Sequence, residues 1–188
     1  GPPEIEGRIF YNDDLSGFNY QAAKVKLDVV LDGIQRHLSD PRPPAFYVGS
    51  TTVDTCLPGF RQDNDVDLGD LRPLASIWLG NQTRIAAHYD VPDNLACCAV
   101  GRRRFILFPP AELENLYVGP LDFTPAGQPI SLVDFRQPDF NRFPRFRQAL
   151  DNAQLAELEP GDALFIPSMW WHYAEALDGF NVLVNYWW

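Results

Sequence analysis

Short strand-like segments fill the second part of this chain, and they restrict its fold more than any other feature. Turns separate these segments every eight to twelve residues or so, a spacing typical of two-layered or closed antiparallel architectures. The pattern therefore predicts a mainly β fold, a sandwich or barrel of the jelly-roll type. The eight runs are ASIWLG (75–80), RIAAHYD (84–90), LACCAVG (95–101), RRFILF (103–108), QLAELE (154–159), DALFIP (162–167), WHYAEAL (171–177) and FNVLVNYWW (180–188).

The first 74 residues differ from the rest, because they hold one helical and one strand pattern instead of a series of strands. AFYVGS (45–50) is typical of a short strand, and CLPGFRQDNDVDLGDL (56–71) is typical of a polar, turn-rich loop. We therefore predict one structural domain, in which an N-terminal helical and strand segment (residues 1–74) packs on a jelly-roll core (residues 75–188).

The helical pattern of the N-terminal segment covers residues 20–38. Val25, Val29 and Ile34 recur near helical spacing, and the stretch SDPRPP ends the pattern. We expect this helix to cover one outer face of the core. His37 is expected in solvent near the C-terminus of the helix, where a positive imidazole interacts favourably with the helix dipole.

A long connection, residues 118–146, interrupts the series of strands. It contains five prolines and five phenylalanines, and it is too apolar for a disordered linker. We predict an ordered insertion that packs across the sheets. Short helices are expected at its two ends, in PPAELENLY (109–117) and FRQALDNA (146–153).

Composition limits the partners and the compartment of the protein. The chain has 15 Lys and Arg against 25 Asp and Glu, a net charge of −10. Because a nucleic-acid backbone is bound by clustered Lys and Arg, this balance argues against a nucleic-acid partner. No apolar run approaches the ~18 residues of a membrane helix, and the N-terminus has no signal-peptide core. Three cysteines without CxxC spacing favour reduced, buried thiols in a cytoplasmic protein.

Two of the three histidines define a candidate metal site. His88 and Asp90 are two residues apart on a predicted strand, so their side chains project to the same face. His172 is the next suitable ligand along the chain. Two histidines and one carboxylate form the facial triad of non-haem Fe(II) oxygenases, which leaves positions open for a cosubstrate and O₂. An HxD pattern alone also occurs on ordinary polar strands, so its context decides between the two interpretations.

That context consists of four segments in a fixed order: HYDVPDNLACCAVGRRRFILFPP (88–110), PDFNRFPRF (138–146), LEPGDALFIPSMWWHY (158–173) and VNYWW (184–188). Together they resemble the cupin-like JmjC family of Fe(II)- and 2-oxoglutarate-dependent oxygenases, which includes the asparaginyl hydroxylase that inhibits the hypoxia-inducible factor. The resemblance covers roughly residues 75–188. It implies a double-stranded β-helix and a hydroxylase of a protein side chain or a small molecule.

The resemblance also implies the cofactors and the site residues. His88, Asp90 and His172 match the iron ligands and are therefore the expected catalytic residues. The cosubstrate would be 2-oxoglutarate, whose decarboxylation to succinate and CO₂ drives the oxidation of a substrate C–H bond. Five further residues match positions that surround the cosubstrate: Arg103, Asn94, Asn185, Tyr47 and Trp187.

Two positions depart from the family pattern. Arg103 stands where a lysine usually binds the far carboxylate of 2-oxoglutarate, and Ile85 stands where a threonine is usual. Arginine can bind a carboxylate through two parallel hydrogen bonds, but it is longer and planar. If Arg103 shares an inward face with Phe105 and Leu107, it is a buried cation that requires an anion; if that face is outward, Arg103 is merely solvated. We predict the inward orientation.

Three functions are compatible with the sequence. The first is an Fe(II)/2-oxoglutarate oxygenase. The second is a metal-binding cupin with a different reaction or a different anionic ligand, which Arg103 and Ile85 suggest. The third is a non-catalytic interaction module that retains the scaffold, although the complete ligand set argues against it. The sequence names neither the substrate nor the oligomeric state.

Overall fold

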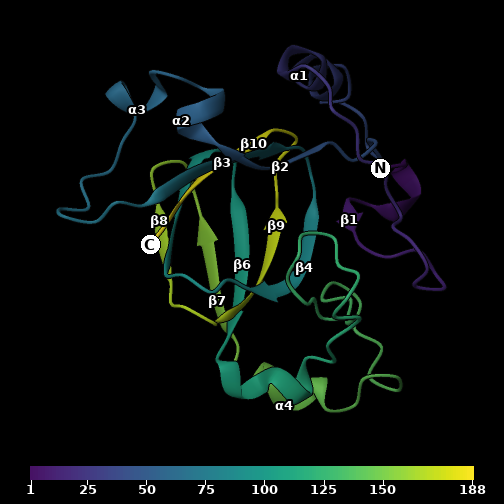
Figure 1. Cartoon of the computed structure of the whole chain (residues 1–188). Helices are drawn as coiled ribbons and strands as arrows, with labels where there is room; N and C mark the ends of the chain where they lie inside the picture. Colours follow the sequence, from purple (N-terminus) through teal and green to yellow (C-terminus); the bar gives the residue numbers. More distant parts are fainter.

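Two five-stranded β-sheets pack face to face in the computed structural model, which describes all 188 residues (Figure 1). The first sheet has the strand order β1-β4-β9-β6-β7, and the second has the order β2-β3-β10-β5-β8. All neighbouring strands are antiparallel except β1 and β4, which are parallel. From β3 to β6 and from β7 to β10, consecutive strands lie in opposite sheets. The predicted mainly β fold of the jelly-roll, cupin type with flanking helices is thereby confirmed.

The strands match the alternating apolar pattern of the sequence closely. All eight strands predicted from residue 75 onward are present, and each end lies within one residue of its expected position. The predicted strand at 45–50 is also present, but it is shifted two residues toward the C-terminus. The ten strands are β1 (Arg8–Ile9), β2 (Tyr47–Thr52), β3 (Leu74–Gly80), β4 (Arg84–Tyr89), β5 (Asn94–Val100), β6 (Arg103–Phe108), β7 (Gln154–Leu158), β8 (Ala163–Ile166), β9 (Trp171–Ala176) and β10 (Asn181–Trp187).

Apolar side chains from both sheets fill the space between them. Their alternation along each strand is what places them there, because successive side chains of a strand point to opposite faces. This inner core consists of Ala96, Cys98, Phe105, Leu107, Leu158, Ile166, Ala174 and Leu183. Along β6, Arg103 is in phase with two members of this core, so its side chain points into the same space.

The N-terminal helix is shorter than predicted. Helix α1 spans Leu27–Arg36 rather than 20–38, and Ile34 is its only buried residue. Val25 and Val29 are 58% and 57% exposed, so the apolar spacing does not form a continuous buried stripe. Because helices in proteins depend mainly on packing, the preceding residues have no support for another turn. Figure 1 shows α1 outside the second sheet. No helix of the chain has the length and apolar character needed to cross a membrane.

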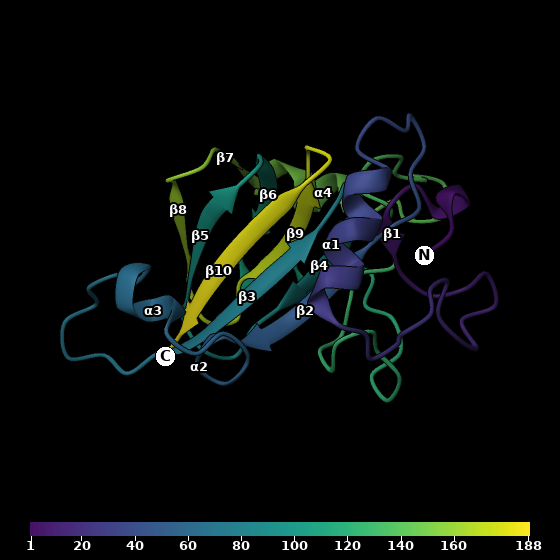
Figure 2. The ribbon, with the colours of Figure 1, turned by 90° about the horizontal axis from the view of Figure 1, so that it is seen from above.

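The segment predicted as a polar loop contains one short helix, α3 (Phe60–Asp63), and begins at the last residue of another, α2 (Val53–Cys56). The loop prediction at 56–71 is wrong in this respect. Val53, fully buried, anchors α2 against the outer face of the second sheet. Figure 2 shows both helices beside the C-terminal end of β10. The expectation of buried thiols fails for Cys56, which is exposed, whereas Cys98 is buried.

The insertion between β6 and β7 is ordered and covers the outer face of the first sheet, as predicted. It begins with the 3₁₀-helix η2 (Pro110–Asn115) and ends with α4 (Phe146–Asp151); a second 3₁₀-helix, η1 (Pro3–Ile5), lies at the N-terminus. The insertion and the strands share one apolar cluster: Ala87, Phe108, Leu116, Val133, Phe143, Phe146, Ala149, Trp171 and Tyr173. The outer face of the first sheet is therefore covered by the insertion.

Candidate metal centre

The three predicted ligands converge at one end of the sandwich. His88 lies near the end of β4, Asp90 follows that strand, and His172 is the direct cross-strand partner of His88 on β9. One ligand atom from each of the three residues lies within 4.8 Å of the other two. His172 Nε2 is 3.8 Å from Asp90 Oδ2. Ligands bound to one divalent ion at about 2.1 Å lie roughly 3 Å apart, so a small adjustment of the side chains would complete a shared site.

A β-bulge in β4 decides which side chains share a face with His88. Ile85 pairs with Ala174 and His88 pairs with His172, so β4 uses one residue more than β9 over this stretch. In a regular strand, residues three apart point to opposite faces. The extra residue lets Ile85 and His88 both point inward, while the two alanines between them pack in clusters outside the sandwich.

Both histidines are oriented by a backbone carbonyl. His88 Nδ1 is 2.9 Å from the carbonyl oxygen of Ala86, and His172 Nδ1 is 3.1 Å from that of Trp170. Because a carbonyl only accepts, each Nδ1 carries the proton, and each Nε2 keeps its lone pair for a metal ion. Burial, and then the neighbouring His88, lower the pKa of His172 to about 3. The ring is therefore neutral at pH 7, which is the form that binds metals.

Two buried asparagines hold the carboxylate. Asn94 on β5 donates from Nδ2 to Asp90 Oδ2 at 3.2 Å, and Asn185 on β10 donates from Nδ2 to Asn94 Oδ1 at 2.6 Å. Since an ionised carboxylate can only accept, Asp90 fixes the orientation of both amides. The structure thus brings both predicted residues to the candidate metal centre, as supports of Asp90. Asn185 Oδ1 is buried without a partner.

Arg103 is the middle residue of three consecutive arginines, and it alone points into the sandwich. Arg102 pairs with Asp178 at 2.9 Å and Arg104 pairs with Glu157 at 2.6 Å, both near the surface. Arg103 is only 6% exposed, as the inward alternative predicts. Burial lowers the pKa of its guanidinium, and the ionisable groups that raise it are Tyr47 and Cys98, with no carboxylate among them. The structure therefore contains a buried cation without an anionic partner.

The position of Arg103 is deeper in the sandwich than the candidate metal ligands. On β6, Leu107 pairs with His172 and Arg103 pairs with Ala176. Four residues of a strand correspond to about 13 Å, a length that an arginine side chain and a small dicarboxylate can span together. We refer below to the end with His88, Asp90 and His172 as the ligand end, and to the end with Arg103 as the deep end.

Tyr47 and two tryptophans line the space between these ends. The Tyr47 ring is 6.0 Å from that of Trp78, and Trp78 meets Trp187 edge-on at 6.0 Å. Burial raises the pKa of Tyr47, Arg103 lowers it and Asp90 raises it further, so this hydroxyl is within electrostatic reach of both ends. Trp78 was not predicted from the sequence, because nothing in ASIWLG indicates which of its two alternating faces is inward.

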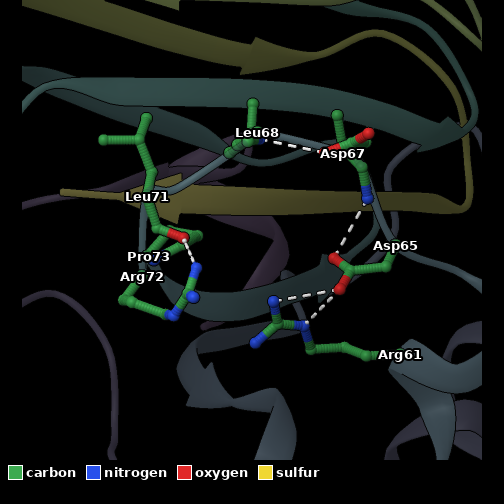
Figure 3. Close-up of a pocket in the computed structure, with 9 residues that line it drawn as sticks. Arg61, Asp65, Asp67, Leu68, Leu71, Arg72 and Pro73 are labelled. Atoms are coloured by element: carbon green, nitrogen blue, oxygen red, sulfur yellow. Dashed lines mark hydrogen bonds and ion pairs between the residues drawn. The ribbon is translucent and has the colours of Figure 1, made fainter.

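One surface pocket of the protein lies outside the sandwich. Its volume is about 520 Å³, and it is formed by the segment between α3 and β3 (Figure 3). Arg61, on its wall, is neutralised by Asp54 and Asp65. The candidate metal ligands are not among its lining residues, so this pocket is not the chemical site.

Comparison with known proteins agrees with this geometry. The whole chain, residues 1–188, matches the model of the cupin-like domain. Lysine-specific demethylase JMJ31 of Arabidopsis thaliana is 34% identical over 63% of this chain and 22% of its own length. Lysine-specific demethylase 8 of Xenopus tropicalis is 35% identical over 72% of this chain and 29% of its own length. The tRNA wybutosine-synthesizing protein 5 of Danio rerio is 38% identical over 54% of this chain and 28% of its own length. The chain thus spans less than a third of each relative.

Proposed function

The chain belongs to the cupin-like (JmjC-type) domain family, and from this premise we propose that it is an Fe(II)- and 2-oxoglutarate-dependent oxygenase that hydroxylates a protein side chain or a small molecule. One observation carries the proposal: the two-histidine, one-carboxylate group and the unpaired Arg103 face the same interior space. A metal ion and a dicarboxylate would satisfy both ends at once.

The donor set at the ligand end fits Fe(II). Two imidazoles and one carboxylate on adjacent corners suit an octahedral ion and leave open positions for other ligands. When bound, Fe(II) would supply the redox chemistry that couples decarboxylation of the 2-oxo acid by O₂ to oxidation of a substrate C–H bond. The contribution of the chain is to present His88 and His172 through Nε2 and to hold Asp90 through Asn94.

The deep end fits the far carboxylate of 2-oxoglutarate. A guanidinium buried without an anion is unfavourable, and a carboxylate that accepts two parallel hydrogen bonds from it removes that penalty. We assign this contact to Arg103, with the Tyr47 hydroxyl as a further donor. Trp187 would form an apolar wall beside the cosubstrate and help to exclude water from the reacting atoms.

The proposed substrate is a protein side chain or a small molecule. The net charge of −10 supports this choice over a nucleic acid, although one relative is named as a tRNA wybutosine-synthesizing protein. The three free cysteines support a reducing compartment such as the cytoplasm.

The proposal is tested by mixing the purified protein with Fe(II) and 2-oxoglutarate without oxygen. We expect the weak visible charge-transfer band of the chelated 2-oxo acid, and we expect Asp90→Ala and His172→Ala each to abolish it. Metal uptake without the band would overturn 2-oxoglutarate as the ligand and favour another anion. Absence of metal uptake would favour a non-catalytic module.

A further inference from the structure

Trp78 lies on the inner face of β3, toward the deep end. Its cross-strand partner on β10 is Leu183, which in turn pairs with Cys98 on β5. The Trp78 side chain packs against the inner core, which includes both of these residues. Its indole Nε1–H is buried and has no hydrogen-bond acceptor in the protein. A buried donor without an acceptor is rare in folded proteins and calls for a ligand that accepts.

Two further side chains that can donate hydrogen bonds lie in the same part of the interior as Trp78. Tyr47, on the adjacent strand β2, is its ring neighbour at 6.0 Å. Arg103 acts electrostatically on Tyr47 and has no carboxylate of its own. Three strands therefore contribute a guanidinium, a phenol and an indole N–H to one region of the interior. This combination suits an anionic oxygen group.

Ile85 points inward and offers the far carboxylate no hydrogen-bond donor, so another residue has to donate in its place. The β-bulge turns Ile85 toward the inner core, where it packs against the same apolar cluster as Trp78. An isoleucine there offers no hydrogen bond. A carboxylate has about four acceptor positions, of which Arg103 can use two. The Tyr47 hydroxyl and one further donor would use the remaining two.

We propose that the indole N–H of Trp78 is that donor, and that it binds the far carboxylate of the 2-oxo acid in place of the hydroxyl that Ile85 lacks. The inference rests on the proposed function and adds Trp78 as a residue that selects a dicarboxylic 2-oxo acid. The Trp78 indole would distinguish 2-oxoglutarate from 2-oxobutyrate, which has the same metal-binding end but no far carboxylate.

The direct test observes the indole N–H itself. The protein is labelled with ¹⁵N-indole tryptophan and loaded with redox-inert Zn(II), and the Trp78 signal is assigned with the Trp78→Phe variant. We expect 2-oxoglutarate to move the Trp78 N–H proton signal downfield, as a new hydrogen bond does, and 2-oxobutyrate to leave it in place. If 2-oxoglutarate binds and the Trp78 signal does not move, the role of Trp78 is refuted and the proposed function stands.

Affinity gives a second, independent readout. Trp78→Phe keeps an aromatic ring and removes the N–H, so we expect about tenfold weaker binding of 2-oxoglutarate by calorimetry, with 2-oxobutyrate unchanged. Trp188→Phe is the control, because Trp188 packs against the apolar cluster on the outer face of the second sheet and not in the interior. It should not change the ratio of the two affinities. Equal losses for both acids in Trp78→Phe would overturn the inference, and no binding of 2-oxoglutarate to the wild-type protein would overturn both proposals.

Discussion

The two ends of the sandwich interior differ in whether the protein itself supplies partners for their charged groups. At the ligand end, Asp90 accepts a hydrogen bond from Asn94, which Asn185 holds in turn. At the deep end, Arg103 is buried and has no carboxylate partner. The protein thus supplies the partners of the charged group at the ligand end, whereas the charged group at the deep end has no anionic partner within the protein. A carboxylate that is held by hydrogen bonds favours a precise metal geometry. A buried cation without a partner favours strong selection for an anionic ligand.

The largest effect is expected from substitutions of Arg103, the unpaired cation of the deep end. Arg103→Ala removes the only inward cation, so we expect 2-oxoglutarate to bind about 100-fold more weakly, while Arg103→Lys keeps the affinity within about tenfold.

Removing an unpaired buried charge should at the same time raise the free energy of unfolding of the ligand-free protein by about 1–3 kcal/mol in Arg103→Met. Calorimetry and urea denaturation measure the two effects. Unchanged binding in all three variants would show that Arg103 does not contact the cosubstrate.

The sequence predicts the ligand end better than the deep end, for a physical reason. His88 and Asp90 lie two residues apart, so strand alternation alone places them on one face. The position of Ile85 depends on the bulge opposite Ala174, and a bulge adds a residue without a signal in the local pattern. The inward orientation of Trp78 depends on which face of β3 meets the other sheet, and the sequence of that strand does not indicate this. The overlong helix prediction has a similar origin, because the helical spacing of Val25 and Val29 does not reveal that both side chains are exposed.

The next expected effect is at Asn94, which donates a hydrogen bond to the proposed metal ligand Asp90. Asn94→Ala leaves Asp90 without its amide donor, so we expect Zn(II) or Fe(II) to bind about 10- to 100-fold more weakly. The gain in affinity from the far carboxylate, measured as the ratio of 2-oxoglutarate to 2-oxobutyrate binding at saturating metal, should not change. Metal titration and calorimetry separate the two quantities. A changed ratio would mean that the two ends are not independent.

The smallest expected effect concerns Ile85, and it tests whether the donors at the deep end share one acceptor group. If Arg103, Tyr47 and Trp78 use the acceptor positions of the carboxylate as we propose, Ile85→Thr in the wild-type protein should change 2-oxoglutarate affinity by less than about threefold. In the Trp78→Phe variant one position is free, and the same threonine should recover most of the lost affinity. Such non-additivity is expected only for groups that act on a common partner. If Ile85→Thr has an equal effect in both backgrounds, the threonine hydroxyl and the Trp78 indole do not donate to the same acceptor atoms. The carboxylate could then bind at the deep end in more than one geometry.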